Sequence, residues 1–149
     1  MKVKLLTATI ALLITQTSLA ASRIDPYTCP SVDTIKNIGI SNTSKDDDLP
    51  SNEWIGVELS NRYGTNDYWT FAIGGFEGKD RSEILAKANA AISTLTFEGG
   101  PYLSMRGEDT EWVCEYASKD GSAKFAVAIT PPLKLNTAEL TRLLQNQKS

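Results

Sequence analysis

Alternation of apolar and polar residues predicts two short strands in the first half of the chain. In the segment 54–60, Ile55, Val57 and Leu59 occupy every second position, which is the period of a strand with one buried face. The segment 68–73 repeats this pattern, and the loop 61–67 between the two favours a hairpin. Gly74 and Gly75 are expected to end the second strand, and the Ser-, Asn- and Asp-rich segment 39–52 is expected to be a surface loop.

A helical period predicts three helices. Residues 31–36 suit a short helix, because Val32 and Ile35 are three positions apart. Asp80 and Glu83 form a capping box that opens the clearest helix of the chain. Its apolar stripe comprises Ile84, Leu85, Ala88, Ala91, Ile92 and Leu95. Near the C-terminus, Asn136 and Glu139 can cap a last short helix that carries Leu140, Leu143 and Leu144.

Three further strands are expected in the second half, at residues 102–106, 112–117 and 124–130. The run 99–101, Gly-Gly-Pro, is expected to interrupt regular structure before the first of them, and Asp120-Gly121 predicts a tight turn between the other two. Short links favour antiparallel pairing, and helices that are segregated from strands favour the α+β class. We therefore expect an antiparallel sheet of about five strands, with the central amphipathic helix and the short C-terminal helix packed on one face.

The first twenty residues have the layout of a cleavable secretory signal. Lys2 and Lys4 precede a mostly apolar stretch at residues 5–14 that is too short to span a bilayer, and the small residues Ser18 and Ala20 suit a cleavage site. The sequence thus predicts a signal peptide at 1–20 and a single exported domain at 21–149. This domain is expected in the periplasm or the medium, without membrane insertion after cleavage.

Two cysteines in an exported chain favour a disulfide between Cys29 and Cys114. Two free thiols or a pair of metal ligands are the alternatives. Because no Cys-x-x-Cys motif is present, nothing supports a thiol oxidoreductase.

Charge and composition exclude several classes of function. The formal net charge is −3, and no cluster of basic residues stands out, which argues against nucleic acid as a partner. The chain contains no histidine, so Ser-His-Asp and Cys-His nucleophile systems are impossible, and the commonest ligand of metals and of haem iron is missing. We therefore expect a protein that is not an enzyme and holds no metal site.

Two clusters of carboxylates leave a weaker alternative open. Residues 46–48 are three consecutive aspartates, and Glu108 and Glu111 lie close together before Trp112. A hydrolase could use Glu108 and Glu111 as an acid/base pair, but runs of charge are usually solvated turns. The aspartate triplet lacks the alternation and the glycine of a calcium loop. The glycine-rich segment 74–78 lacks the Gly-Lys-Ser/Thr ending of a phosphate loop.

Aromatic residues are the more promising candidates for a binding site. Tyr63, Tyr68, Tyr102 and Tyr116 all lie in or beside expected strands. If Tyr68 and Tyr116 face away from the helix-covered side of the sheet, they could line a surface for a planar apolar ligand. Trp69, Phe71 and Trp112 are instead expected in the core.

The order of several features resembles a family of small exported bacterial proteins. These features are the signal peptide, Cys29-Pro30 before a short helix, the Tyr-Trp-Thr-Phe strand at 68–71, the alanine-rich helix and Cys114-Glu115-Tyr116. One member of that family is described as a haemin-binding protein, so the resemblance implies a small planar ligand such as haem. Without histidine, the iron would need tyrosinate, a free thiolate or Met105, the one methionine after the signal. A secreted factor that binds a protein partner is the alternative.

Overall fold

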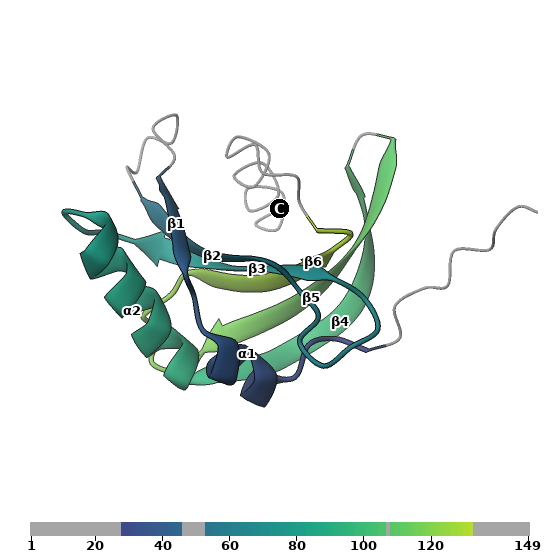
Figure 1. Cartoon of the computed structure of the whole chain (residues 1–149), viewed down its shortest axis with the longest axis horizontal. Coiled ribbons are helices and arrows are strands. Elements are labelled where there is room, and N and C mark those ends of the chain that lie inside the picture. Colours follow the sequence, from purple (N-terminus) through teal and green to yellow (C-terminus); the bar gives the residue numbers. More distant parts are fainter. Residues whose placement is uncertain (1–27, 46–52, 107, 133–149) are drawn as a thin grey trace, which may run out of the picture.

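Each of two helices is followed by three strands in the computed structural model, which describes residues 28–45, 53–106 and 108–132 (Figure 1). The elements are α1 (Val32–Ile38), β1 (Asn42–Lys45), β2 (Trp54–Asn61), β3 (Trp69–Phe76), α2 (Arg81–Ser93), β4 (Leu95–Arg106), β5 (Asp109–Ser118) and β6 (Phe125–Thr130). The strands form one antiparallel sheet in the order β1-β2-β3-β6-β5-β4. The prediction of an α+β fold with antiparallel pairing is confirmed, but the sheet has six strands and not five.

The additional strand is β1, which lies in the segment that the polar composition predicts to be a loop. It pairs with β2 along its length, from Asn42 opposite Val57 to Lys45 opposite Trp54. All four of its side chains are only half-buried. An edge strand needs backbone pairing and not an apolar face, so its sequence does not show the alternation of a core strand.

Two glycine-containing segments that are expected to end regular structure are instead parts of strands. β3 continues through Gly74, where a Cβ would overlap the ring of Phe125 on β6, so the glycine allows that ring to pack on the strand. β4 runs through Gly100, whose φ of 116° lies in the region that favours glycine. The pairing of β4 with β5 shifts register on both sides of Gly99. Gly74 therefore allows close packing within β3, and the Gly-Gly-Pro segment forms a bulge within β4. Neither segment ends its strand.

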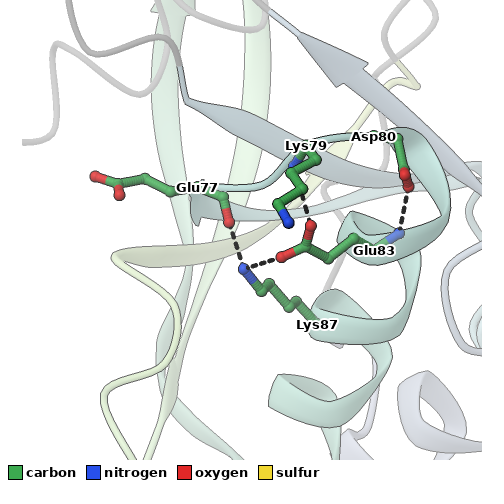
Figure 2. Close-up of polar contacts among 5 residues, drawn as sticks. All are labelled: Glu77, Lys79, Asp80, Glu83 and Lys87. Carbon is green, nitrogen blue, oxygen red and sulfur yellow. Dashed lines mark hydrogen bonds and ion pairs between the residues drawn. The ribbon is translucent and has the colours of Figure 1, made fainter.

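Both helices begin at the residues that their sequences indicate. The Ser31 hydroxyl accepts a hydrogen bond from the Thr34 backbone N–H at 3.2 Å and starts α1. The Asp80 carboxylate accepts one from the Glu83 N–H at 2.9 Å, and the Glu83 carboxylate accepts one from the Lys79 N–H at 3.0 Å (Figure 2). Side chains thus satisfy N–H groups that have no partner within the helix.

Both helices lie on one face of the sheet, where they form the main core (Figure 1). α2 buries Ile84, Ala88, Ala91 and Ile92. Ala88 and Gly56 of β2 approach so closely that a Cβ at Gly56 would lie 2.7 Å from the Ala88 methyl group. The sheet contributes Trp69, Phe71 and Ile73 to this core, as the alternation in β3 predicts. Leu95, which the sequence places in the apolar stripe of the helix, is instead the first residue of β4, where it pairs with Ser118 of β5.

The opposite face of the sheet carries a second apolar cluster. Its members are Ile55, Val57, Ala72, Val113, Val127 and Ile129, each buried. The central strands β3 and β6 are therefore buried on both faces. The tips of β4 and β5 rise away from the helix-covered side (Figure 1). The expected helix with Leu140, Leu143 and Leu144, like the expected signal peptide, lies outside the described residues.

The predicted disulfide between Cys29 and Cys114 is present. It joins the segment before α1 to the fully buried middle of β5, across 85 residues of sequence. Beside it, the Tyr116 hydroxyl donates a 2.6 Å hydrogen bond to the Pro30 carbonyl. A covalent and a polar contact thus hold the N-terminal segment to the sheet.

Candidate functional site

Two of the candidate tyrosines, Tyr63 and Tyr116, lie in the core. They are 2% and 4% exposed, and Tyr116 points to the helix-covered side, where its ring contacts Phe71 edge-on at 5.8 Å. Burial raises the pKa of both hydroxyls far above the usual value for tyrosine. Both phenols therefore stay protonated at neutral pH, whereas a tyrosine ligand of haem iron acts as the phenolate.

The hydroxyls of these two tyrosines differ in one useful respect. That of Tyr116 is hydrogen-bonded to Pro30, whereas that of Tyr63 is buried and bonds to no residue in the described part of the chain. Tyr116→Phe is expected to lower the free energy of unfolding by about 1–3 kcal/mol, because it leaves a buried carbonyl without its donor. Tyr63→Phe is expected to leave it unchanged or slightly raised, because it removes a buried hydroxyl without a partner. Urea unfolding followed by tryptophan fluorescence checks both variants, and equal losses would contradict these roles.

Tyr68 is exposed but stands apart from the other candidates. It immediately precedes β3, is 48% exposed, and its ring lies 4.9 Å from the guanidinium carbon of Arg62. A cation above the ring face is a favourable arrangement that occupies that face. In the sheet, β6 and β5 lie between β3 and β4, so Tyr68 is not part of a site on β4.

Tyr102 and Met105, in contrast, both lie on β4 and are both exposed. Of the six large apolar side chains that the described residues expose, four belong to this strand: Phe97, Tyr102, Leu103 and Met105, with exposed fractions of 49%, 52%, 58% and 65%. A long edge strand with this many exposed apolar side chains is unusual, because such edges promote association.

The pairing of β4 with β5 shows which of these side chains share a face. Leu103 and Met105 are opposite Trp112 and Thr110, on the side of the sheet that carries the helices. Phe97 lies on the same side, opposite Tyr116 and 5.5 Å from its ring. We call Phe97, Leu103 and Met105 the β4 surface. Tyr102 is opposite Val113 and points to the other face, so one flat ligand cannot contact both Tyr102 and Met105 on the same side.

The backbone of β4 is the second feature of this region. The strand pairs with β5 alone and forms one edge of the sheet. Its first half is interrupted by the bulged Gly-Gly-Pro segment, but from Tyr102 to Arg106 it pairs regularly and contains neither lysine nor proline, two residues that commonly protect edges. Every second residue of this half therefore presents its N–H and C=O groups outward.

Sequence reasoning missed Leu103 and Phe97 as candidates. The signal for Leu103 is present in the sequence, since Tyr-Leu-Ser-Met at 102–105 places apolar residues on both faces of a strand. A strand with two apolar faces is expected in the centre of a sheet. That β4 is an edge strand, with these side chains exposed, follows only from the strand order.

The carboxylates of the hydrolase alternative lie in different environments. Glu108 is in an exposed turn, whereas Glu111 is 2% exposed and lies within β5, opposite Ser104. Residues 46–48 lie outside the described part of the chain. Among the described residues, no group of three or more Cys, Asp or Glu is placed to hold a metal ion. None of the helices described is long and apolar enough to cross a membrane.

Comparisons with known proteins show the family of the chain and no function. No curated protein and no solved structure matches the chain. A model of one protein family matches residues 28–142, which include every helix and strand described above. The chain therefore belongs to the family DUF4949, a domain of unknown function.

Proposed function

We propose that the chain is an exported, non-enzymatic binding protein that holds an apolar ligand on the β4 surface. The observation that carries this proposal is the concentration of exposed apolar side chains on one edge strand. Single exposed apolar residues are normal on protein surfaces, but several on one element indicate a site of interaction. The missing histidine supports a binding role over catalysis, since general acid–base chemistry most often uses that residue.

The ligand that we propose first is haem or another planar apolar molecule. A flat ring system can lie across Leu103, and the Met105 thioether on the same face is a known type of ligand for haem iron. The other sulfur atoms described are joined in the disulfide, and the tyrosines of the core are protonated. Met105 is therefore the residue that we assign to the iron.

An absorption titration of the oxidised protein with haemin tests this assignment. The expected result is a saturating one-to-one transition with a shifted Soret band. Leu103→Ser with Met105→Ser is expected to weaken binding at least about tenfold, since it removes both the apolar contact and the thioether. Tyr68→Ser, on a distant exposed tyrosine, is the matched control and is expected to bind like the unmodified protein.

A second candidate function is supported by the open backbone of β4. A protein partner could add an extended segment beside residues 102–106, with hydrogen bonds to the backbone and apolar contacts to Leu103 and Met105. A linear, unsaturable response to haemin would contradict the planar ligand and favour this alternative. The same double variant and the Tyr68→Ser control then serve in a pull-down, where a true partner is lost from the double variant alone.

A further inference from the structure

The regular half of β4, residues 102–106, has the sequence of a central strand but lies at an edge of the sheet described above. It carries apolar side chains on both faces, since Tyr102 points to one face and Leu103 and Met105 point to the other. All three side chains are at least half exposed. A strand with two apolar faces suits a position between two neighbouring strands. A further strand beside β4 would therefore give this segment the surroundings that its sequence suits.

One hydrogen bond at the start of β4 shows how the ladder between β4 and β5 is phased. The Lys119 N–H donates to the Thr94 carbonyl at 3.2 Å, just outside the residue pair Leu95–Ser118. In an antiparallel ladder, a bond in this place makes Leu95–Ser118 a pair that exchanges no hydrogen bonds of its own. Ser118 therefore directs its own N–H and C=O groups away from β4.

This phase determines which backbone groups of β4 point outward. Directions alternate along a strand, and β5 pairs with β6 in unbroken register from Trp112 to Tyr116. The alternation therefore continues to Trp112 and Thr110, whose backbone groups also point away from β4. Their partners on β4 are Leu103 and Met105. The N–H and C=O groups of Leu103 and Met105 thus point outward from the edge of the sheet, towards the place of a further strand.

We propose that this further strand is β4 of a second copy of the chain, paired antiparallel about a two-fold axis at Ser104. The inference rests on the second candidate function, the addition of an extended segment to β4, and it names that segment. The bulge at 99–101 and the end of β4 at Arg106 limit the regular segment to residues 102–106. Only an axis at the middle residue, Ser104, pairs this segment with itself along its whole length.

The proposed register uses the outward backbone groups of both copies. Leu103 of one copy is opposite Met105 of the other, and each pair exchanges two N–H to C=O hydrogen bonds. The two-fold axis repeats this pair, so the same surface of both copies closes the interface. An interface of this kind removes both open edges at once and makes β4 a central strand of one continuous sheet.

The side chains of the segment are compatible with self-pairing. On the helix-covered side of the sheet, Leu103 meets Met105, so that apolar side chains contact each other across the interface. At the axis, the two small Ser104 residues are opposite each other. The only charged residue of the segment, Arg106, is at its end, so like charges are not placed opposite each other. Because the paired segment is short, the dimer is expected to be weak, with a dissociation constant of about 10–100 µM.

Sedimentation velocity of the oxidised protein, from about 1 µM to 1 mM, tests the dimer. The expected result is a reversible, concentration-dependent dimer. Met105→Pro is expected to weaken it at least about tenfold, because proline has no N–H to donate, although it is tolerated at an outward position of an edge strand. Met105→Leu keeps the N–H and an apolar side chain, and it is expected to dimerise like the unmodified protein. A chain that is monomeric at 1 mM, or Met105→Pro that dimerises equally well, would overturn the proposal.

Cysteine substitutions test the register. In Ser104→Cys the two substituted Cα atoms are expected about 4.5 Å apart, within the range of a disulfide, whereas in Met105→Cys they are expected about 8 Å apart and out of range. Mild oxidation, with the native disulfide intact, is expected to link Ser104→Cys into a covalent dimer at least about tenfold faster than Met105→Cys. Equal rates for the two variants would overturn the register.

Failure of the dimer and failure of the ligand site give different results. A haemin titration at about 1 µM protein, below the expected dissociation constant of the dimer, measures the ligand on single chains. Met105→Leu is expected to lose the iron ligand and to keep the dimer. Haemin binding by a chain that is monomeric at 1 mM would overturn this inference and support the ligand site. A different protein captured through β4 by such a monomeric chain would support the second candidate function and overturn self-pairing.

Discussion

Replacing both cysteines, as Cys29→Ser with Cys114→Ala, is expected to lower the free energy of unfolding by about 4–5 kcal/mol. The bond closes a loop of 85 residues, and the entropy that it removes from the unfolded chain grows with the logarithm of loop length. Alanine is chosen at Cys114 because this residue is fully buried, where a serine hydroxyl would add a cost of its own. This loss is a large share of the total free energy of unfolding of a typical domain, which is about 5–15 kcal/mol.

Urea unfolding of the oxidised, reduced and doubly substituted proteins measures this effect. The reduced protein and the double variant are expected to unfold at similar urea concentrations, both well below the oxidised protein. Cys29→Ser alone is the control, and it is expected to lose almost as much, because the bond acts as a unit. A double variant as stable as the oxidised protein would show that packing alone holds the N-terminal segment to β5.

Trp69→Ala is expected to lower the free energy of unfolding by about 3–5 kcal/mol. The Trp69 side chain is fully buried between the sheet and the helices, and alanine would leave a large cavity there. The substitution also removes the 2.9 Å hydrogen bond from the indole N–H to the Thr65 hydroxyl, which helps to close the β2–β3 hairpin. The effect combines lost apolar burial with a lost polar contact in a turn.

Two neighbouring substitutions separate these contributions. Tyr68→Ala removes an exposed aromatic ring one residue away and is expected to cost less than about 1 kcal/mol. Thr65→Val removes the partner of the indole N–H and is expected to cost about 1–2 kcal/mol. If Trp69→Ala cost no more than Tyr68→Ala in urea unfolding, the assignment of Trp69 to the main core would be wrong.

Much of the fold could be predicted because its strongest signals are local. Alternation in β2 and β3 shows which residues share a face, and the Asp80–Glu83 capping box gives the start of α2 to within one residue. The disulfide follows from the number of cysteines together with the expected export. Each of these inferences depends on neighbouring residues or on composition and not on the order of strands.

The features that sequence reasoning missed depend on long-range contacts. In the sequence, Gly74 looks like the end of a strand. In the structure it lies within β3, because the ring of Phe125, about fifty residues later, packs against it. β1 has no apolar face, so only its partner β2 shows that it is a strand. Tyr102 and Tyr116 look alike in the sequence, but one is exposed on an edge strand and the other is buried. The candidate site could therefore be assigned only after the strand order was known.

The position of β6 has a consequence for how the chain acquires its structure. β6 is the last described strand in the sequence, yet it lies in the middle of the sheet, between β3 and β5. Until residues 125–130 arrive, the first three strands and the β4–β5 hairpin are two separate pieces without a shared sheet. A chain that crosses a membrane with its N-terminus first would thus remain incomplete until nearly all of it has passed through. Under the export that we propose, this late completion would keep the sheet open during translocation and delay its closure until residues 125–130 have crossed the membrane.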